Sequence, residues 1–161
     1  MKDIRIEKVT LNMGCGTKLK PEIAKSLLER ITGSKAVIIN TRKRTTFNVP
    51  SGMPIGCKVT IRKRREELLK RLLEAVDKKL KPSCFDATGN FSFGIKEYID
   101  IPGMEYDPSI SILGLDVCVT LERPGFCIKR KKISRKIGKA HAITRDEAMA
   151  FMKEKFGAAI D

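Results

Sequence analysis

The sequence predicts an α+β fold with a single two-layer domain, in which helices cover one face of a mixed or antiparallel sheet. Several short stretches alternate apolar and polar residues, which is the period of strands. Other stretches repeat apolar residues every three to four positions, which is the period of helices. The two kinds of stretch follow one another along 161 residues, a length suited to one domain. We therefore expect residues 1–161 to form one domain.

Five stretches are expected to be strands. Apolar residues occupy alternate positions in residues 4–13, 57–62 and 115–121. Shorter strands are expected at residues 36–41 and around Phe91, Phe93 and Ile95. The first two stretches point polar side chains outward, namely Lys8, Thr10, Asn12, Lys58, Thr60 and Arg62. The uncovered face of the sheet is thus expected to be cationic and rich in hydrogen-bonding groups.

Three stretches are expected to be helices. The first begins at Pro21, a residue suited to the first helical turn, and continues until Gly33. The second has an apolar stripe from Leu68 to Leu80, before Pro82. The third covers residues 145–156, where Thr144 and Glu147 have the spacing of a capping box and Gly157 follows the last turn.

Positive charge is concentrated in two segments. The chain has 33 Lys and Arg against 19 Asp and Glu, a formal net charge of +14, which favours a polyanionic partner. The projecting loop, about residues 43–56, contains two prolines and two glycines and lies between basic clusters at 42–44 and 62–65. The basic segment, about residues 123–140, is expected to be an arm or ribbon because Gly138 interrupts it. Its central cations are Lys129, Arg130, Lys131, Lys132, Arg135 and Lys136.

Catalysis, cofactors and metals are not expected. Residues 89–94 have the glycine separation of a phosphate-binding loop, but Lys96 is displaced and no Ser or Thr follows it. His141 is the only histidine, without a nucleophile near it in sequence. The five cysteines are scattered without a C-x-x-C pair, which indicates reduced thiols. A nucleotide- or RNA-processing enzyme with a basic cleft and a free RNA chaperone stay as alternatives to a structural RNA-binding protein.

Four stretches resemble, in order, the large-subunit ribosomal proteins that bind 5S ribosomal RNA (rRNA), number five in the universal naming. They are Ile6–Gly14, Pro54–Arg62, Phe85–Gly94 and Asp116–Thr120. The basic tail, with residues 123–125, Gly138 and His141, resembles the archaeal type of this family. The resemblance implies a non-catalytic structural constituent of the large ribosomal subunit. No apolar run reaches the roughly 18 residues of a membrane helix, so we expect a cytoplasmic protein without membrane contact.

The resemblance also implies partners and contact residues. Binding of 5S rRNA, and its linkage to the large rRNA in the central protuberance, is expected at Asn12, Thr41, Arg42, Arg44, Lys58, Thr60 and Arg62. Contact of the projecting loop with transfer RNA (tRNA) in the P site is expected at Phe47, Asn48, Val49, Pro50, Ser51, Gly52, Met53 and Pro54. The cations of the basic segment are expected to contact further rRNA. Neighbouring large-subunit ribosomal proteins are expected as partners, and a homo-oligomer is not.

Overall fold

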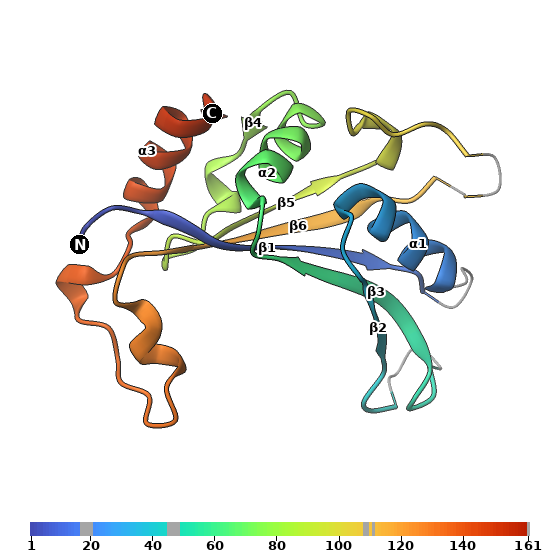
Figure 1. Ribbon diagram of the computed structural model, residues 1–161, viewed down its shortest axis with the longest axis horizontal. Coiled ribbons are helices and arrows are strands. Elements are labelled where there is room, and N and C mark those ends of the chain that lie inside the picture. The colour runs from blue at the N-terminus through green and yellow to red at the C-terminus, as the bar shows by residue number, and fades with distance from the viewer. Residues whose placement is uncertain (17–20, 45–48, 108–109, 111, 161) are drawn as a thin grey trace.

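A computed structural model describes residues 1–16, 21–44, 49–107, 110 and 112–160 (Figure 1). The protein has the two layers that the sequence predicts, with helices on one face of an antiparallel five-stranded sheet. The strands, in their order across the sheet, are β2 (Val37–Asn40), β3 (Pro54–Ile61), β1 (Arg5–Gly14), β6 (Leu115–Glu122) and β5 (Phe91–Ile95). The helices are α1 (Pro21–Thr32), α2 (Arg65–Glu74) and α3 (Arg145–Phe156).

The strand β1 lies at the centre of the sheet, and its alternating apolar side chains form part of the buried face. Val9, Leu11 and Met13 are fully buried, and the polar residues between them are not. Leu11 lies opposite Val59 on β3 and opposite Val117 on β6, so three strands turn apolar side chains toward the helices in register. Because side chains alternate along a strand, the remaining positions of these strands share the opposite, uncovered face.

Each helix packs an apolar stripe onto the buried face of the sheet or beside it. The buried positions are Ala24, Leu27, Leu28 and Ile31 of α1, Leu68, Leu69, Leu72 and Leu73 of α2, and Ala148, Met152 and Phe156 of α3. The predicted capping box of α3 is confirmed, since the Thr144 hydroxyl accepts a hydrogen bond from the Glu147 N–H and the Glu147 carboxylate accepts one from the Thr144 N–H. Gly157, with a φ of 62°, ends this helix.

The prediction that the second helix continues to Leu80 was wrong. Helix α2 ends at Glu74, and the N–H of Lys78 donates to the Leu73 carbonyl at 2.8 Å, which closes the helix. Asp77 and Lys78 have positive φ, so the chain leaves the helical direction there. Lys79–Leu80 forms the short strand β4 instead, paired in parallel with β7 (Ala159–Ile160). Leu80 is nevertheless buried, as its apolar spacing indicated.

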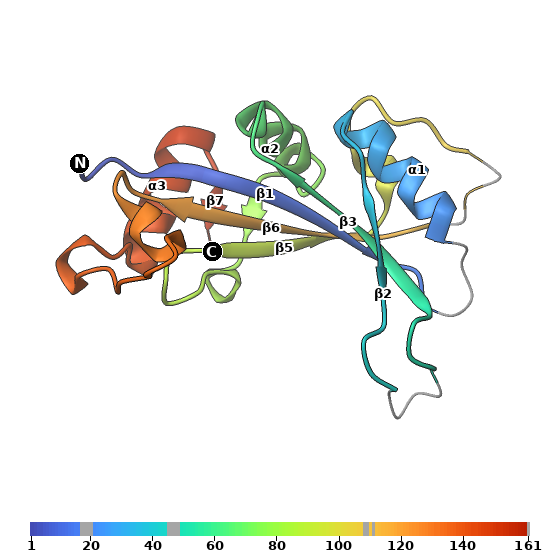
Figure 2. The ribbon, with the colours of Figure 1, turned by 60° about the horizontal axis from the view of Figure 1, so that its bottom comes forward.

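Two segments leave the sheet on the side opposite the helices (Figures 1 and 2). The connection between β2 and β3 projects at one end of the sheet, and the chain after β6 projects at the other. This second projection contains two 3-10 turns, η3 (Phe126–Arg130) and η4 (Lys139–His141), joined by irregular chain. Two further 3-10 turns, η1 (Pro82–Cys84) and η2 (Tyr98–Asp100), lie elsewhere in the described residues. No helix in the described part of the chain has the length and apolar character to cross a membrane.

Candidate nucleic-acid interface

The uncovered face of the sheet, called here the open face, presents polar residues of β1 and β3 in paired rows. Asn12 lies opposite Lys58, and Thr10 lies opposite Thr60. Lys58 and Thr60 are exposed, and Asn12 and Thr10 are half-buried. Side chains directly opposite one another on antiparallel strands have Cβ atoms about 4.5–5.5 Å apart. Each pair can therefore act on the same small region of a partner.

The rows continue onto β6 and β5 with a different chemical character. Asp116 lies opposite Asn12, and Cys118 lies opposite Thr10. Ser92 of β5 then lies opposite Cys118. All three of Asp116, Cys118 and Ser92 are exposed. The open face is thus cationic on its β3 side and neutral or acidic on its β6 side, which gives an anionic partner a preferred position.

Three predicted cations border the β3 side of the open face. Arg62 follows the end of β3, and Arg42 and Arg44 follow β2 at the base of the projecting loop. All three are exposed, and their side chains have no ion pair with another described residue. Their charge is therefore free to face a polyanion rather than the protein's own carboxylates.

Thr41 has a local structural role that the sequence did not reveal. Its N–H donates to the Met53 carbonyl at 2.8 Å, and its hydroxyl lies 2.8 Å and 3.0 Å from the carbonyl oxygens of Met53 and Pro50. Its own carbonyl accepts a hydrogen bond from the Gly52 N–H at 2.9 Å. Thr41 thus closes the base of the loop, and the Ser51 hydroxyl adds a hydrogen bond to the Arg42 carbonyl.

The described members of the predicted tRNA-contacting set lie on the side of the loop that leads into β3. Phe47 and Asn48 lie outside the described residues. Pro50, Ser51 and Gly52 are exposed, whereas the remaining described members, Val49, Met53 and Pro54, are half-buried. Pro54 is also the first residue of β3, so the projecting part of the loop is shorter than the sequence indicated.

The cations of the basic segment divide into two kinds. Five of them are exposed without an ion pair to another described residue, namely Lys129, Lys131, Lys132, Arg135 and Lys136. Arg130 instead binds two carboxylates, those of Glu7 on β1 and Glu122 on β6, the second at 2.7 Å. Arg5 also pairs with the buried Glu122, at 2.8 Å. Arg130 therefore anchors η3 to the sheet.

A second ion pair joins the start of the basic segment to the first turn of α3. Arg123 is 5% exposed and pairs with Glu147 at 2.8 Å, and its guanidinium also donates to the Ala142 carbonyl at 3.1 Å. The pKa of Glu147 is lowered, first by the hydrogen bond from the Thr144 N–H and next by Arg123. Neither ion pair was predicted, because Glu7 and Arg130 are 123 positions apart and no repeating pattern marks such partners.

His141 packs within the protein. Its Nε2 lies 2.9 Å from the Pro124 carbonyl oxygen, and its ring meets the edge of the Phe126 ring, with centroids 5.5 Å apart. Lys129 lies over the same phenyl ring at 5.8 Å. These contacts hold the turn after β6 together and give the imidazole a packing role.

The sequence alternatives to RNA binding have no support in the geometry. Gly94 lies inside β5, and Gly89 is packed so closely that a Cβ there would meet the Ile143 side chain at 2.5 Å, so this stretch is not a phosphate-binding loop. Within the described residues, no group of three or more His, Cys, Asp or Glu side chains could hold a metal ion. Burial, and next the neighbouring Cys15, raise the pKa of the Cys57 thiol to about 11, so that thiol is protonated at neutral pH.

A two-layer α+β domain with an uncovered sheet face and exposed cations on its β3 side has the characteristics of an RNA-binding protein. Comparison with known proteins defines the family. Residues 54–151 match the C-terminus of the ribosomal L5 family. The large ribosomal subunit protein uL5 of Cenarchaeum symbiosum is 48% identical over 164 residues, which cover 99% of this chain and 97% of the relative. Those of Nitrosopumilus maritimus and Nanoarchaeum equitans are 47% and 46% identical, over 99% of this chain and 95% and 97% of the relatives.

The chain therefore belongs to the ribosomal L5 family, and it is of the archaeal type of that family. Its relatives are ribosomal proteins and not enzymes, which excludes the processing enzyme that the sequence left open.

Proposed function

We propose that the protein is a structural constituent of the large ribosomal subunit, where it binds 5S rRNA and links it to the large rRNA in the central protuberance. The family and the relatives named large ribosomal subunit protein support the coarser part, including a place in the ribosome of the cytoplasm. The finer part rests on the arrangement of the open face. Neighbouring large-subunit proteins are further partners in this proposal.

The paired rows of β1 and β3 are the observation that carries the proposal. Lys58 offers a charge to a phosphate, while Asn12, Thr10 and Thr60 offer amide and hydroxyl groups to phosphate oxygens and 2′-hydroxyls. These rows contain no aromatic side chain, so they suit the backbone and groove of folded RNA rather than the stacking of single-stranded bases.

The cations at both ends of the open face extend this site. Arg42, Arg44 and Arg62 border it on the β3 side. The basic segment projects on the same side of the sheet, at the other end (Figure 1). We assign 5S rRNA to the open face with Thr41 and the three arginines, and further rRNA to the exposed cations of the basic segment. Arg130 is the anchor of that segment, and its half-exposed guanidinium also faces the rRNA in this proposal.

The projecting loop is assigned to tRNA in the P site. Thr41 closes its base with hydrogen bonds to the Met53 and Pro50 carbonyls, which join the two ends of the loop next to the sheet. A loop on a rigid base suits a contact that forms anew with each tRNA. Its residues 47–54 are the proposed contacts.

Replacing Lys58 with Glu tests the open-face assignment. Lys58 is exposed and has no ion pair with a described residue, so the change leaves the fold intact. We expect Lys58→Glu to weaken binding to transcribed archaeal 5S rRNA about tenfold or more. The matched control is Lys153→Glu on α3, the same charge reversal at an exposed site away from the open face, with affinity within about twofold of the original. A folded Lys58→Glu protein with unchanged affinity would refute the assignment.

Sedimentation separates a ribosomal constituent from a free RNA chaperone. The tagged protein is expressed in an archaeal host, and large subunits are washed at high salt before sedimentation. A constituent stays with the subunit, because its interface is completed by several RNA segments. Release of all the protein into the wash would support the chaperone instead.

A further inference from the structure

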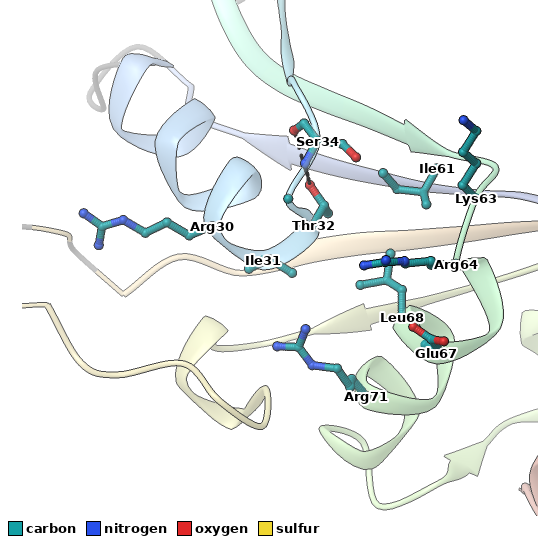
Figure 3. A pocket seen from close by; sticks show the side chains of 11 residues that line it. Arg30, Ile31, Thr32, Ser34, Ile61, Lys63, Arg64, Glu67, Leu68 and Arg71 are labelled. Carbon is teal, nitrogen blue, oxygen red and sulfur yellow. Dashed lines mark hydrogen bonds between the residues drawn. The ribbon is translucent and has the colours of Figure 1, made fainter.

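A cationic hollow lies in the helical layer, between the end of α1 and the start of α2 (Figure 3). The cavity has a volume of about 390 Å³. Four cations line it, Arg30, Lys63, Arg64 and Arg71, against a single carboxylate, that of Glu67. Figure 3 shows Arg64 and Arg71 extending from α2 toward the side where α1 lies. This hollow is separate from the open face, because the sheet lies between them.

The cations of this hollow are incompletely neutralised. Among the described residues, Lys63 and Arg64 have neither an ion pair nor a side-chain hydrogen bond, and both are exposed. Arg71 uses one nitrogen to donate to the Pro102 carbonyl at 2.9 Å, which leaves other N–H groups of its guanidinium for a ligand. Arg30 pairs with Asp107 at 3.3 Å while its side chain remains 60% exposed. An anion entering the hollow would thus meet available donors.

Two further hollows border this cavity and share lining residues with it. One neighbour shares Arg64 and Glu67 with it, and the other shares Gly33 and Ser34. Together they add Arg65, Lys70, Lys25 and Lys35 to the cations of the lining, with the carboxylates of Glu66 and Glu29. Arg62 also lines one of them, and since it follows the end of β3 it lies where the furrow and the open face meet. We call the three hollows the helix-side furrow. A row of cations along a furrow matches a ligand whose negative charges also repeat along its length.

We propose that the helix-side furrow binds the sugar–phosphate backbone of a second segment of structured RNA, while the open face holds the first. The inference rests on the proposed function in taking rRNA as the partner, and it adds a second binding surface to it. Arginine forms paired hydrogen bonds with phosphate oxygens, and three of the four cations of the central hollow are arginines. The Ser34 hydroxyl adds a neutral donor beside them.

The lining favours RNA over an acidic protein segment. The apolar residues of the central hollow, Ile31, Ile61 and Leu68, are only 2%, 7% and 8% exposed. The hollow therefore offers charge and hydrogen bonds but little apolar surface. Protein interfaces depend on buried aromatic or aliphatic anchors at their centre, whereas nucleic-acid interfaces are more polar and more positively charged.

The backbone of Arg64 allows a test that separates charge from folding. Arg64 caps α2 with a φ of 50°, a conformation that glycine adopts at lower cost. The variant Lys63→Ala/Arg64→Gly therefore removes two charges without adding backbone strain. Lys78, with a φ of 57°, and Lys79 allow the matched control Lys78→Gly/Lys79→Ala, which removes two charges outside the furrow.

The experiment uses the full chain, already saturated with 5S rRNA, and measures its binding to labelled, transcribed large-subunit rRNA of an archaeon. We expect Lys63→Ala/Arg64→Gly to weaken binding of the large rRNA about tenfold, with 5S rRNA affinity within about twofold of the original. Glu67→Gln, which removes the carboxylate of the central hollow, should strengthen binding of the large rRNA. The control Lys78→Gly/Lys79→Ala should bind both RNAs as the original protein does.

Three results would overturn the proposal. The first is unchanged binding of the large rRNA by Lys63→Ala/Arg64→Gly together with no effect of Glu67→Gln. The second is an equal loss of large-rRNA affinity in the matched control, which would show that binding depends on the net charge of the protein and not on the furrow. The third is that Lys63→Ala/Arg64→Gly loses affinity for poly-glutamate but not for RNA. That result would indicate an acidic protein partner. Loss of 5S rRNA binding by the original protein would instead refute the proposed function, and the large rRNA titration alone would still test the furrow.

Discussion

Asn12 on β1 lies directly opposite Lys58 on β3, on the face of the sheet that the helices leave uncovered. The pair puts an amide and an ammonium group within reach of the same nucleotide. Asp116 lies on the other side of Asn12, so the amide separates the cation from the nearest carboxylate in its row. A neutral side chain at this position keeps Lys58 available to RNA.

Replacing Asn12 with Asp, a residue of nearly the same shape, should neutralise the positive charge of Lys58. The new carboxylate would face the ammonium group and add to the charge of Asp116. We expect Asn12→Asp to weaken 5S rRNA binding about tenfold, since phosphate would be repelled and one cation would be paired internally. The neutral variant Asn12→Ser should weaken binding about threefold, by the loss of one hydrogen bond. Equal effects of the two variants in a filter-binding titration would show that charge at this position is unimportant.

Shortening the projecting loop should separate tRNA contact from 5S rRNA binding. Replacing residues 46–49 with two glycines leaves the hydrogen bonds of Thr41 to Pro50 and Met53 in place. We expect 5S rRNA affinity within about twofold of the original. Large subunits reconstituted with the variant should synthesise polypeptide more slowly than those with the original protein. Loss of 5S rRNA binding would mean that the loop itself holds that RNA.

The secondary structure was predictable wherever a pattern is local. The alternation ending at Met13 predicted β1, and the spacing of Thr144 and Glu147 predicted the start of α3. The end of α2 was not predictable, because Leu80 continues the apolar spacing of the helix. That residue is instead placed by a parallel pairing with Ile160, at the other end of the chain. Such long-range pairing leaves no repeating pattern in the sequence.

The candidate site was predictable in composition but not in detail. Alternation alone placed Lys58 and Thr60 on the outward face of their strand. It could not distinguish Arg130, which binds Glu7 and Glu122, from the exposed cations beside it. The helix-side furrow was also hidden, because Arg30 and Arg64 line the same hollow only when α1 and α2 pack on the same sheet face.

Arg130 and Arg135 should behave differently although both belong to the basic segment. Arg130→Met leaves the buried Glu122 with Arg5 as its remaining cation, so we expect a loss of about 1–2 kcal/mol of unfolding free energy. Arg135→Met removes an exposed charge and should change stability by less than about 0.5 kcal/mol. It should still weaken rRNA binding. Urea unfolding of both variants measures the difference, and equal stability of the two would contradict the anchoring role of Arg130.

Glu147→Gln should destabilise the protein at neutral pH by about 1 kcal/mol, because it leaves the buried Arg123 without its carboxylate. Solvent screening limits this cost, because the Glu147 side chain is 43% exposed. The pKa of Glu147 is lowered in the folded protein, so its stabilisation is present above the unfolded value of about 4.3. That stabilisation is lost as the pH falls through the folded pKa.

Urea unfolding of the original protein and Glu147→Gln between pH 7 and pH 3 measures this dependence. The stability difference should be constant near neutral pH and should shrink as the solution is acidified below about pH 4.3. A difference that is independent of pH would show that the charge of Glu147 does not contribute.

The salt dependence of 5S rRNA binding tests the central claim most directly. Lys58 lies within β3 and Arg62 follows its end, and both are exposed cations without ion pairs to described residues. If both contact phosphates, Lys58→Ala/Arg62→Ala should flatten the slope of log affinity against log salt by about 1.4–1.8. Lys153→Ala/Lys155→Ala on α3 should leave that slope unchanged. An identical slope for the original protein and the Lys58→Ala/Arg62→Ala variant would contradict RNA binding by the open face.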